Sequence, residues 1–341
     1  MIYFDVTKTG DAGHRSGLTR VSGKLLAGLG TSATPVRWNS WNRTMAAGDW
    51  FFTAELFSED ERVGITEFLK SSPGRKAAVF HDAIPLKFPE TTWPQSVARH
   101  PGYMKLLSYF DRIWADSAAS RDELVGLWKW QGVDRVPPVD VLALGADFDG
   151  SPRVRALAPV LRAKPVLLSV GIVEPRKNQM LLLDVAEELW STGLEFELHV
   201  VGRINPHFGR PIAQRLKSLS GKFPGLHFHE AARDQVVSDL YRRARATLFP
   251  TRAEGCGLPL LESLWRGVPC VCTDLPVLRE NFSGGGCLAV ALDDRPAWCE
   301  AIRRIVTDEA LHARLVAEAT SRQLPTWTDA AATLKAKLQV F

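Results

Sequence analysis

Two carboxylates, Glu254 and Glu262, stand eight positions apart on either side of a glycine-rich turn. The apolar run 246–249 before them predicts a buried strand that ends where the turn begins. Glu254 then lies on the loop after that strand, and Glu262 lies one turn into the helix that follows. Carboxylate oxygens accept several hydrogen bonds at once, so the pair suits a ligand that is rich in hydroxyl groups.

The turn between them predicts an anion site. Gly255 and Gly257 let the backbone approach a ligand closely, and Pro259 suits the first turn of a helix, where its missing N–H needs no partner. The N–H groups near Leu258, at the start of this helix, would face a phosphate. A diphosphate cradle beside two carboxylates fits a nucleotide-sugar. The alternative for Glu262 is a glutamate that only complements the helix dipole.

A second motif supplies positive charge. Arg176 and Lys177 follow the predicted strand 165–170 and Gly171. Arginine offers a phosphate a bidentate fork and lysine offers a point charge. Positive potential at this place would stabilise a departing diphosphate. The alternative is a solvated basic face at the start of a helix. Arg203, after the strand 196–201, is a reserve cation.

These motifs resemble those of family-4 retaining glycosyltransferases, the mannosyl- and glucosyl-type group 1 enzymes of the GT-B fold. The turn resembles the family's Glu-x7-Glu signature, and residues 169–178 resemble its Val-Gly-x-x-x-Pro-(R/K)-Lys-Asn phosphate motif. His81-Asp-Ala-Ile-Pro resembles its His-Asp-x-Ile-Pro segment, and residues 115–124 resemble a strand-to-helix junction of the family. Shorter landmarks occur in the same order at 144–147, 201–203 and 326–328.

The resemblance implies an activity. A hexose would pass from a nucleotide-diphosphate sugar, GDP-mannose or another, to a glycan or lipid-linked saccharide, as in synthesis of surface polysaccharide or lipopolysaccharide. The mechanism would be retaining, front-face and metal-independent, with no cofactor beyond the donor substrate. Glu254 would contact the donor sugar without acting as a nucleophile. The catalytic residues would be Glu254, His81, Arg176 and Lys177, and those binding the donor would be Gly17, Gly171, Arg203, Gly255, Gly257, Leu258 and Glu262.

The chain departs from the family at two places. Ile172 stands where several members carry an arginine, and Ser16 stands where the paired glycine of the N-terminal loop is usual, just before Gly17. A strand-end histidine is often only structural, but the Asp82 and Pro85 that follow His81 favour a role in the site. Asp82 could orient the imidazole or bind the acceptor.

These motifs need two parallel α/β layers to position them, because each follows a predicted strand and ligands bind at the carboxyl ends of such strands. We expect a GT-B fold, with two facing Rossmann-like domains, a cleft between them and a C-terminal helix that returns to the first. The expected domains are 1–150 for the acceptor, 151–325 for the donor, and the helix 326–341, capped by Thr326 or Thr328. Five strands are expected in each half, at 1–6, 33–38, 76–81, 112–116 and 139–143, then at 165–170, 196–201, 225–229, 245–250 and 269–273. The expected helices are 17–29, 59–70, 96–109, 119–130, 177–191, 210–220, 234–243 and 258–266.

Composition is ordinary for a globular protein. The chain has 341 residues, of which 45% are hydrophobic and 23% are charged, with a net charge of +4. Residues 1–150 contain 17 basic residues (Lys and Arg) and 18 acidic ones (Asp and Glu). The rest of the chain contains 25 basic and 20 acidic residues, so the second half carries the positive charge. No basic cluster typical of nucleic-acid binding occurs. An odd number of cysteines, with no signal peptide and no apolar run of membrane-spanning length, predicts a cytoplasmic protein.

Seven of the 11 tryptophans precede residue 150. They could contact the inner face of a membrane, although packing and lining of the acceptor site are favoured because tryptophan is highly buried on average. Other features are discounted: Asp147-Phe-Asp149 is interpreted as linker, Cys270 and Cys272 as buried small side chains, and His227 with His229 as core or surface rather than metal ligands. No metal is expected.

Two other classes of function stay open. A sugar-nucleotide epimerase of GT-B fold would share the diphosphate cradle, but the spacing of Glu254 and Glu262 argues against it. A non-catalytic nucleotide-sugar-binding protein would not need the full set of charged residues. A Rossmann dehydrogenase is weaker still, because no Gly-x-Gly-x-x-Gly follows the first strand.

Overall fold

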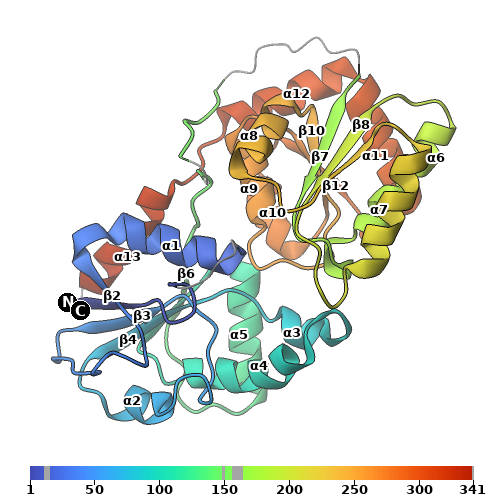
Figure 1. The fold of residues 1–341 in the computed structure, drawn as a ribbon. Coiled ribbons are helices and arrows are strands. Elements are labelled where there is room, and N and C mark those ends of the chain that lie inside the picture. Colours follow the sequence, from blue (N-terminus) through green and yellow to red (C-terminus); the bar gives the residue numbers. More distant parts are fainter. Residues whose placement is uncertain (11–15, 148–149, 156–163, 340–341) are drawn as a thin grey trace. The chain divides into compact units, whose positions relative to one another are not determined.

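The structure is a computed structural model that describes residues 1–10, 16–147, 150–155 and 164–339 (Figure 1). The chain divides into two compact units, Met1–Gly145 with Pro325–Phe341 and Ala146–Leu324. Within the described residues, each unit is built on one sheet of six parallel strands, with helices on both faces. The expectation of five strands per sheet was therefore wrong by one in each unit.

The first unit has the strand order β2-β1-β3-β4-β5-β6. On one face of the sheet, apolar side chains of three helices pack against the strands. On the other face lie the first helix and the last (Figure 1). The strands are β1 (Ile2–Asp5), β2 (Ala33–Val36), β3 (Trp50–Thr53), β4 (Arg75–Phe80), β5 (Arg112–Ala115) and β6 (Val139–Val141). The helices of the packed face are α2 (Ile65–Ser71), α4 (Pro94–Leu107) and α5 (Ala118–Trp130), and the short α3 (Ile84–Lys87) precedes α4. The opposite face carries α1 (Gly17–Leu29) and α13 (Trp327–Gln339).

Helix α13 completes this unit. Thr326 caps it as predicted, because the Asp329 N–H donates to Thr326 Oγ1 at 3.1 Å and the Thr326 N–H donates to Asp329 Oδ2 at 2.8 Å. The helix packs on α1 so closely that a Cβ on Gly28 would collide with the side chain of Ala331. The face that α1 buries therefore depends on a segment near the other end of the sequence.

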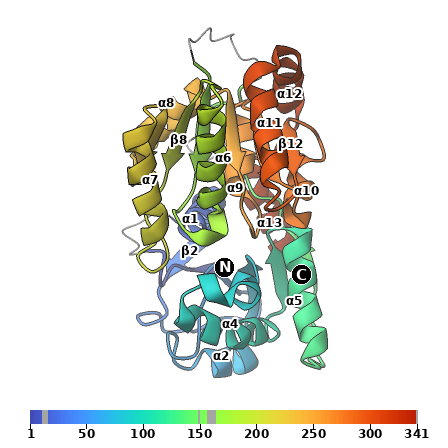
Figure 2. The same ribbon diagram turned by 90° about the vertical axis from the view of Figure 1, so that its right-hand side faces the viewer.

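The second unit has the strand order β12-β11-β10-β7-β8-β9. Helices α6, α7 and α11 cover one face of the sheet, and α8 and α9 cover the other (Figure 1); Figure 2 looks onto the first of these faces, with α6 and α7 in front of the strands. The strands are β7 (Val166–Val170), β8 (Glu197–Val201), β9 (Leu226–His229), β10 (Ala246–Phe249), β11 (Cys270–Thr273) and β12 (Cys287–Val290). The helices are α6 (Gln179–Ser191), α7 (Arg210–Lys222), α8 (Asp234–Arg243), α9 (Leu258–Trp265), α10 (Pro276–Phe282), α11 (Arg295–Thr307) and α12 (Glu309–Ser321).

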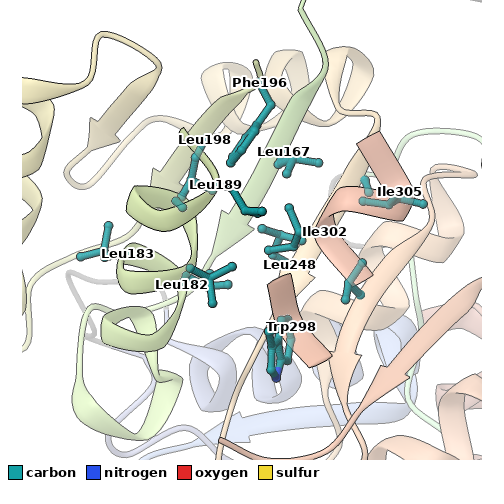
Figure 3. Packing of buried hydrophobic residues seen from close by; sticks show 14 of the residues in the cluster. Leu167, Leu182, Leu183, Leu189, Phe196, Leu198, Leu248, Trp298, Ile302 and Ile305 are labelled. Atoms are coloured by element: carbon teal, nitrogen blue, oxygen red, sulfur yellow. The ribbon is translucent and has the colours of Figure 1, made fainter. Parts of the chain in front are cut away.

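The main core of this unit lies between the sheet and α6, α7 and α11. Figure 3 shows leucines of the central strands packed in one cluster with leucines of α6 and with Trp298, Ile302 and Ile305 of α11. All of these side chains are buried. This packing holds β7 and β10 side by side in the middle of the sheet, which places the loops after both strands next to each other.

The tryptophans of the first unit mostly serve its core. Trp38, Trp50 and Trp128 are buried, and Trp41 stacks on Phe51 with ring centroids 5.6 Å apart. Trp130, at the end of α5, is 81% exposed. The packing interpretation therefore holds for the buried tryptophans. Among the described residues, no helix combines the length and the hydropathy that crossing a bilayer requires.

Candidate active site

The loops after β7 and β10 form one cluster in the second unit. These strands are parallel neighbours, so their carboxyl ends meet at the same edge of the sheet. The backbone N–H of Arg252 donates to the carbonyl of Arg176 at 2.8 Å, which ties the two loops together. The two charged motifs, separated by 77 positions in the sequence, are thereby brought into contact.

A buried ion cluster lies at this junction. Lys177 Nζ lies 2.5 Å from Glu254 Oε1, and Thr251 Oγ1 donates to the same oxygen at 2.6 Å. Arg176 lies 3.4 Å from that oxygen and also donates to the Ala253 carbonyl at 2.8 Å. The side chains of Lys177 and Glu254 are only 11% and 9% exposed, so water screens their charges weakly.

The pKa shifts of this pair follow from burial and from charge. Burial favours a neutral Glu254, but the charges of Lys177 and Arg176 and two hydrogen bonds outweigh it, so the pKa of Glu254 is lowered. Burial lowers the pKa of Lys177, and the charge of Arg176 lowers it further, against the attraction of Glu254. Glu254 is therefore ionised, and the positive charges of Lys177 and Arg176 stabilise the ionised form.

Glu174 is a member of the cluster that sequence reasoning missed. It is buried, its Oε1 accepts from Arg176 Nε at 3.0 Å, and its Oε2 accepts from Asn205 Nδ2 at 2.8 Å. Its position inside the phosphate motif is the feature of the sequence that could have identified Glu174. With both carboxylates ionised, the two cations and two carboxylates of the cluster have no net charge.

The turn before α9 has the geometry that its sequence predicts. Gly257 caps the helix in the left-handed region, at φ +84°, and a Cβ there would overlap the side chain of Leu278. Leu258 is the first helical residue, and Pro259 occupies the first turn. Asn281 Nδ2 donates to the carbonyl of Cys256 at 2.5 Å and braces the loop. Gly255 is buried in the same loop. The helix thus begins beside the ion cluster, with its first N–H groups at the loop end.

Glu262 lies one turn into α9, as predicted, and is buried. Its Oε2 accepts a hydrogen bond from the hydroxyl of Tyr241 on α8 at 3.0 Å. Burial and the adjacent carboxylate raise the pKa of Tyr241 well above its usual range, so it stays a donor. Tyr241 was not predicted, because nothing in the sequence places α8 beside α9.

The other predicted donor residues of this unit lie on the loops after β7 and β8. The Gly171 carbonyl lies where a Cβ on Gly202 would be, so the two loop backbones are in close contact. Arg203 is exposed, and its carbonyl accepts from the Val173 N–H at 2.9 Å. The structure does not bring the Arg203 side chain into the ion cluster.

His81 follows β4 in the first unit and is buried. Its Nε2 donates to the Ala54 carbonyl at 2.9 Å, and its Nδ1 lies 3.4 Å from Asp116 Oδ2. Burial alone would lower the pKa of His81, but the hydrogen bond and charge of Asp116 raise it, and burial raises the pKa of Asp116 to about 6. A contact of His81 with the donor sugar stays a prediction.

The suggestion that Asp82 orients His81 is wrong. Asp82 Oδ1 accepts from the Ile84 N–H at 2.9 Å, and its carbonyl accepts from His100 Nε2 at 3.0 Å. Asp116 takes the orienting place because β5 pairs with β4 in parallel, so the residues after the two strands are neighbours. The strand-to-helix junction at residues 115–124 is the feature of the sequence that could have identified Asp116. Asp116 Oδ1 is buried without a hydrogen-bond partner.

Gly17 is the first residue of α1, and Ser16 is its N-cap. Ser16 Oγ accepts from the Thr19 N–H at 3.2 Å and the Ser16 N–H donates to Thr19 Oγ1 at 2.7 Å. The serine that stands in place of the usual glycine therefore serves as the N-cap of α1. Residues 11–15 of the predicted N-terminal loop, and residues 148–149 of the Asp-x-Asp segment, lie outside the described part of the chain. Cys270 and Cys272 are buried and free, as predicted.

Residues 164–308 match the family model described as glycosyl transferases group 1. The chain carries a group 1 glycosyl transferase domain. This domain contains the whole ion cluster, the turn before α9 and Glu262, whereas His81 and Gly17 precede it. The recognition of the family from its motifs is confirmed.

Proteins similar to this chain include bacterial mannosyltransferases. The chain is 29% identical over 241 residues to the serotype-specific mannosyltransferase WbdA of Escherichia coli, which covers 67% of this chain and 29% of WbdA. It is 29% identical over 138 residues to the O-antigen chain mannosyltransferase RfbU of Salmonella typhimurium, covering 40% of this chain and 37% of RfbU. The matched region thus spans less than a third of the length of WbdA.

The fold is also found in solved structures. The sucrose-phosphate synthase of Thermosynechococcus elongatus superposes with a TM-score of 0.66 at 18% identity, over 84% of this chain and 72% of that one. This likeness confirms the GT-B fold class that the sequence motifs imply.

Proposed function

We propose that this protein transfers a hexose from a nucleotide-diphosphate sugar, GDP-mannose or another, to a hydroxyl of a glycan or lipid-linked saccharide. The product would belong to a surface polysaccharide or lipopolysaccharide. The observation that carries the proposal is the buried cluster of Arg176, Lys177 and Glu254 beside the start of α9. The names of WbdA and RfbU support mannose as the sugar.

The reaction would be a retaining, front-face transfer. The bond between the anomeric carbon and the diphosphate oxygen breaks, and the acceptor oxygen bonds to the same face of that carbon. The proton of the acceptor hydroxyl passes to the departing phosphate oxygen, which leaves with the nucleoside diphosphate. Negative charge grows on the diphosphate, where Arg176, Lys177 and the N–H groups at the start of α9 would stabilise it.

Binding would require an exchange of partners. Because the cluster has no net charge, the diphosphate must replace Glu254 as the partner of Lys177. Glu254 would then be released to accept hydrogen bonds from hydroxyl groups of the donor sugar. Glu174 would keep Arg176 in place, because its Oε1 contacts both Nε and Nη2 of the arginine. Glu262, which Tyr241 holds by a hydrogen bond, would take the ribose hydroxyls.

Residues of the first unit would act on the transferred sugar and the acceptor. His81, oriented by Asp116, would face the donor sugar, and Gly17 would lie near its phosphate. Lys177 and Arg176 provide the positive charge that a divalent cation brings to a diphosphate in other enzymes, so we expect activity without added metal. A lipid-linked acceptor would bring the chain to a membrane face, which the exposed Trp130 would contact.

A binding screen followed by a turnover assay tests the proposal. The full chain is melted with UDP, GDP, dTDP and ADP and with their sugars, each with and without EDTA. A ligand at about a hundred times its dissociation constant adds about 2.7 kcal/mol of stability, which is readily measured. We expect a shift for one nucleotide class, unchanged by EDTA, and slow release of nucleotide from its sugar.

The outcomes separate the candidate functions. Binding without release or transfer of the sugar, with any acceptor offered, would favour a nucleotide-sugar sensor. Interconversion of two sugar-nucleotides would favour an epimerase. No shift with any nucleotide would refute the donor site at the ion cluster.

A further inference from the structure

Four titratable side chains cluster on strands β8 and β9, apart from the candidate active site. Glu197 and His199 lie on β8, and His227 and His229 lie on β9. His199 pairs in register with His227, and residues two apart on a strand share a face, so all four project from the same face of the sheet. The ring centroid of His199 lies 4.5 Å from that of His227 and 5.2 Å from that of His229.

We propose that Glu197, His199 and His227 bind a zinc ion. One potential ligand atom from each residue lies within 4.8 Å of those of the other two. Tetrahedral zinc with bonds of about 2.0–2.1 Å holds neighbouring ligand atoms about 3.3–3.4 Å apart. Glu197 Oε2 and His199 Nε2 are separated by 3.2 Å, so this pair already has the spacing of two zinc ligands. A rotation of the His227 side chain supplies the third ligand, and water supplies the fourth.

His229 would act as a positioning residue for this site. Its Nε2 lies 2.9 Å from His199 Nδ1, within hydrogen-bond distance. When His199 Nδ1–H donates to His229 Nε2, the lone pair of His199 lies on Nε2, on the side of Glu197. Histidines that bind metals usually make such a hydrogen bond through the other ring nitrogen, and it fixes their tautomer and their orientation. The cluster therefore contains both a set of ligands and a partner that orients one of them.

The types of ligand point to zinc, and their place in the fold separates this ion from the candidate active site. Two imidazole nitrogens and one carboxylate oxygen suit zinc better than magnesium or calcium, which prefer oxygen ligands. Glu197 is the first residue of β8, whereas the loops of the candidate active site follow the carboxyl ends of strands. Strand β9 lies at one edge of the sheet and pairs with β8. An ion shared by the two strands would fasten this edge, independently of any sugar transfer.

One cation competes for the site. Arg243, at the end of α8, has Nη2 3.7 Å from Glu197 Oε2, and its side chain is 41% exposed. In the absence of zinc this arginine neutralises part of the carboxylate charge. Removal of Arg243 should therefore strengthen zinc binding, whereas a purely structural cluster of hydrogen bonds would be weakened by the same change.

The test is a zinc titration of the full chain, purified without a histidine tag and treated with chelator. Isothermal calorimetry should show one zinc ion per chain, and zinc should raise the melting temperature of the second unit. His227→Ala should weaken zinc binding at least about a hundredfold, because it removes a ligand. His229→Ala should weaken it about tenfold, because it removes only the orienting hydrogen bond. Arg243→Gln should tighten binding severalfold.

The matched control is His207→Ala, which removes an exposed histidine from the loop after β8. This variant should bind zinc as the wild type does. Equal losses in His207→Ala and His227→Ala, or no binding at one-to-one stoichiometry, would overturn the proposal and leave adventitious surface binding only. Circular dichroism checks that each variant is folded. The nucleotide-induced shift in melting temperature should persist after removal of zinc, so failure of this site is distinguishable from failure of the proposed function.

Discussion

The buried pair of Lys177 and Glu254 supports a quantitative prediction through a double-mutant cycle. The cycle compares Glu254→Gln, Lys177→Met and the double variant with the wild type. Each single change leaves one charge almost buried without its partner, at a contact of 2.5 Å with side-chain exposures of 11% and 9%. The double change removes both charges, so it should destabilise the protein by less than the sum of the two single changes.

The magnitudes follow from burial and from the remaining contacts. Removing one partner of a buried ion pair costs about 3–5 kcal/mol. The glutamine oxygen in Glu254→Gln can still accept from Thr251, which makes about 2–3 kcal/mol the better expectation. In a unit of this size that corresponds to a fall of roughly 4–12 °C in melting temperature. The coupling free energy between the two sites should be about 1–3 kcal/mol.

Scanning calorimetry on the full chain measures the stabilities, and donor turnover is measured on the same samples well below the melting temperature. Lys177→Met should weaken both nucleotide binding and turnover. Glu254→Gln should keep nucleotide affinity near that of the wild type and reduce turnover at least about a hundredfold.

The control is Glu309→Gln, which breaks an ion pair whose glutamate side chain is 77% exposed, and it should leave both properties nearly unchanged. A coupling free energy near zero, or wild-type turnover in Glu254→Gln, would refute the reasoning.

Two further predictions concern the geometry around the site. Gly257→Ala should lower the melting temperature and weaken nucleotide binding, because an alanine at φ +84° is strained and its methyl group would overlap Leu278. If the nucleotide-induced shift in melting temperature is unchanged in this variant, the turn is not part of the phosphate site. Asp116→Asn should reduce turnover about tenfold with nucleotide binding unchanged. Since burial raises the pKa of Asp116 to about 6, wild-type turnover should rise with pH through that value as the carboxylate ionises. The asparagine variant should lack this rise. The control Asp140→Asn, at a partly buried ion pair away from His81, should retain it. The same rise in Asp116→Asn would contradict the assignment.

The sequence carries local information well and pairing information poorly. The bounds of α1 and α8 match their predicted ranges, because a capping serine and a clear helical period mark them. Strand β3 was missed because its four residues are all buried and show no alternation, and β12 was missed because it is a short strand directly after three glycines.

The site shows the same limit. The start of α9, with Pro259 in its first turn, follows from neighbouring residues and was predicted, whereas the left-handed cap at Gly257 is a finding of the structure. The contact of Lys177 with Glu254 depends on β7 lying beside β10, and the contact of His81 with Asp116 depends on the pairing of β4 with β5. The order of strands in a sheet is a property of the whole unit, so these partners were not assigned to one another from sequence.

The first unit has a further property, which concerns the order of synthesis. Its two segments, Met1–Gly145 and Pro325–Phe341, are separated by about 180 residues that form the other unit. At roughly 5–20 residues per second, a ribosome needs about 10–40 s to pass from β6 to α13. During this time the apolar face of α1, which includes Val21 and Leu25, lacks the helix that packs on it. The second unit is continuous and can fold before α13 is made. During that time the surface of α1 depends on a chaperone or on residual structure for protection.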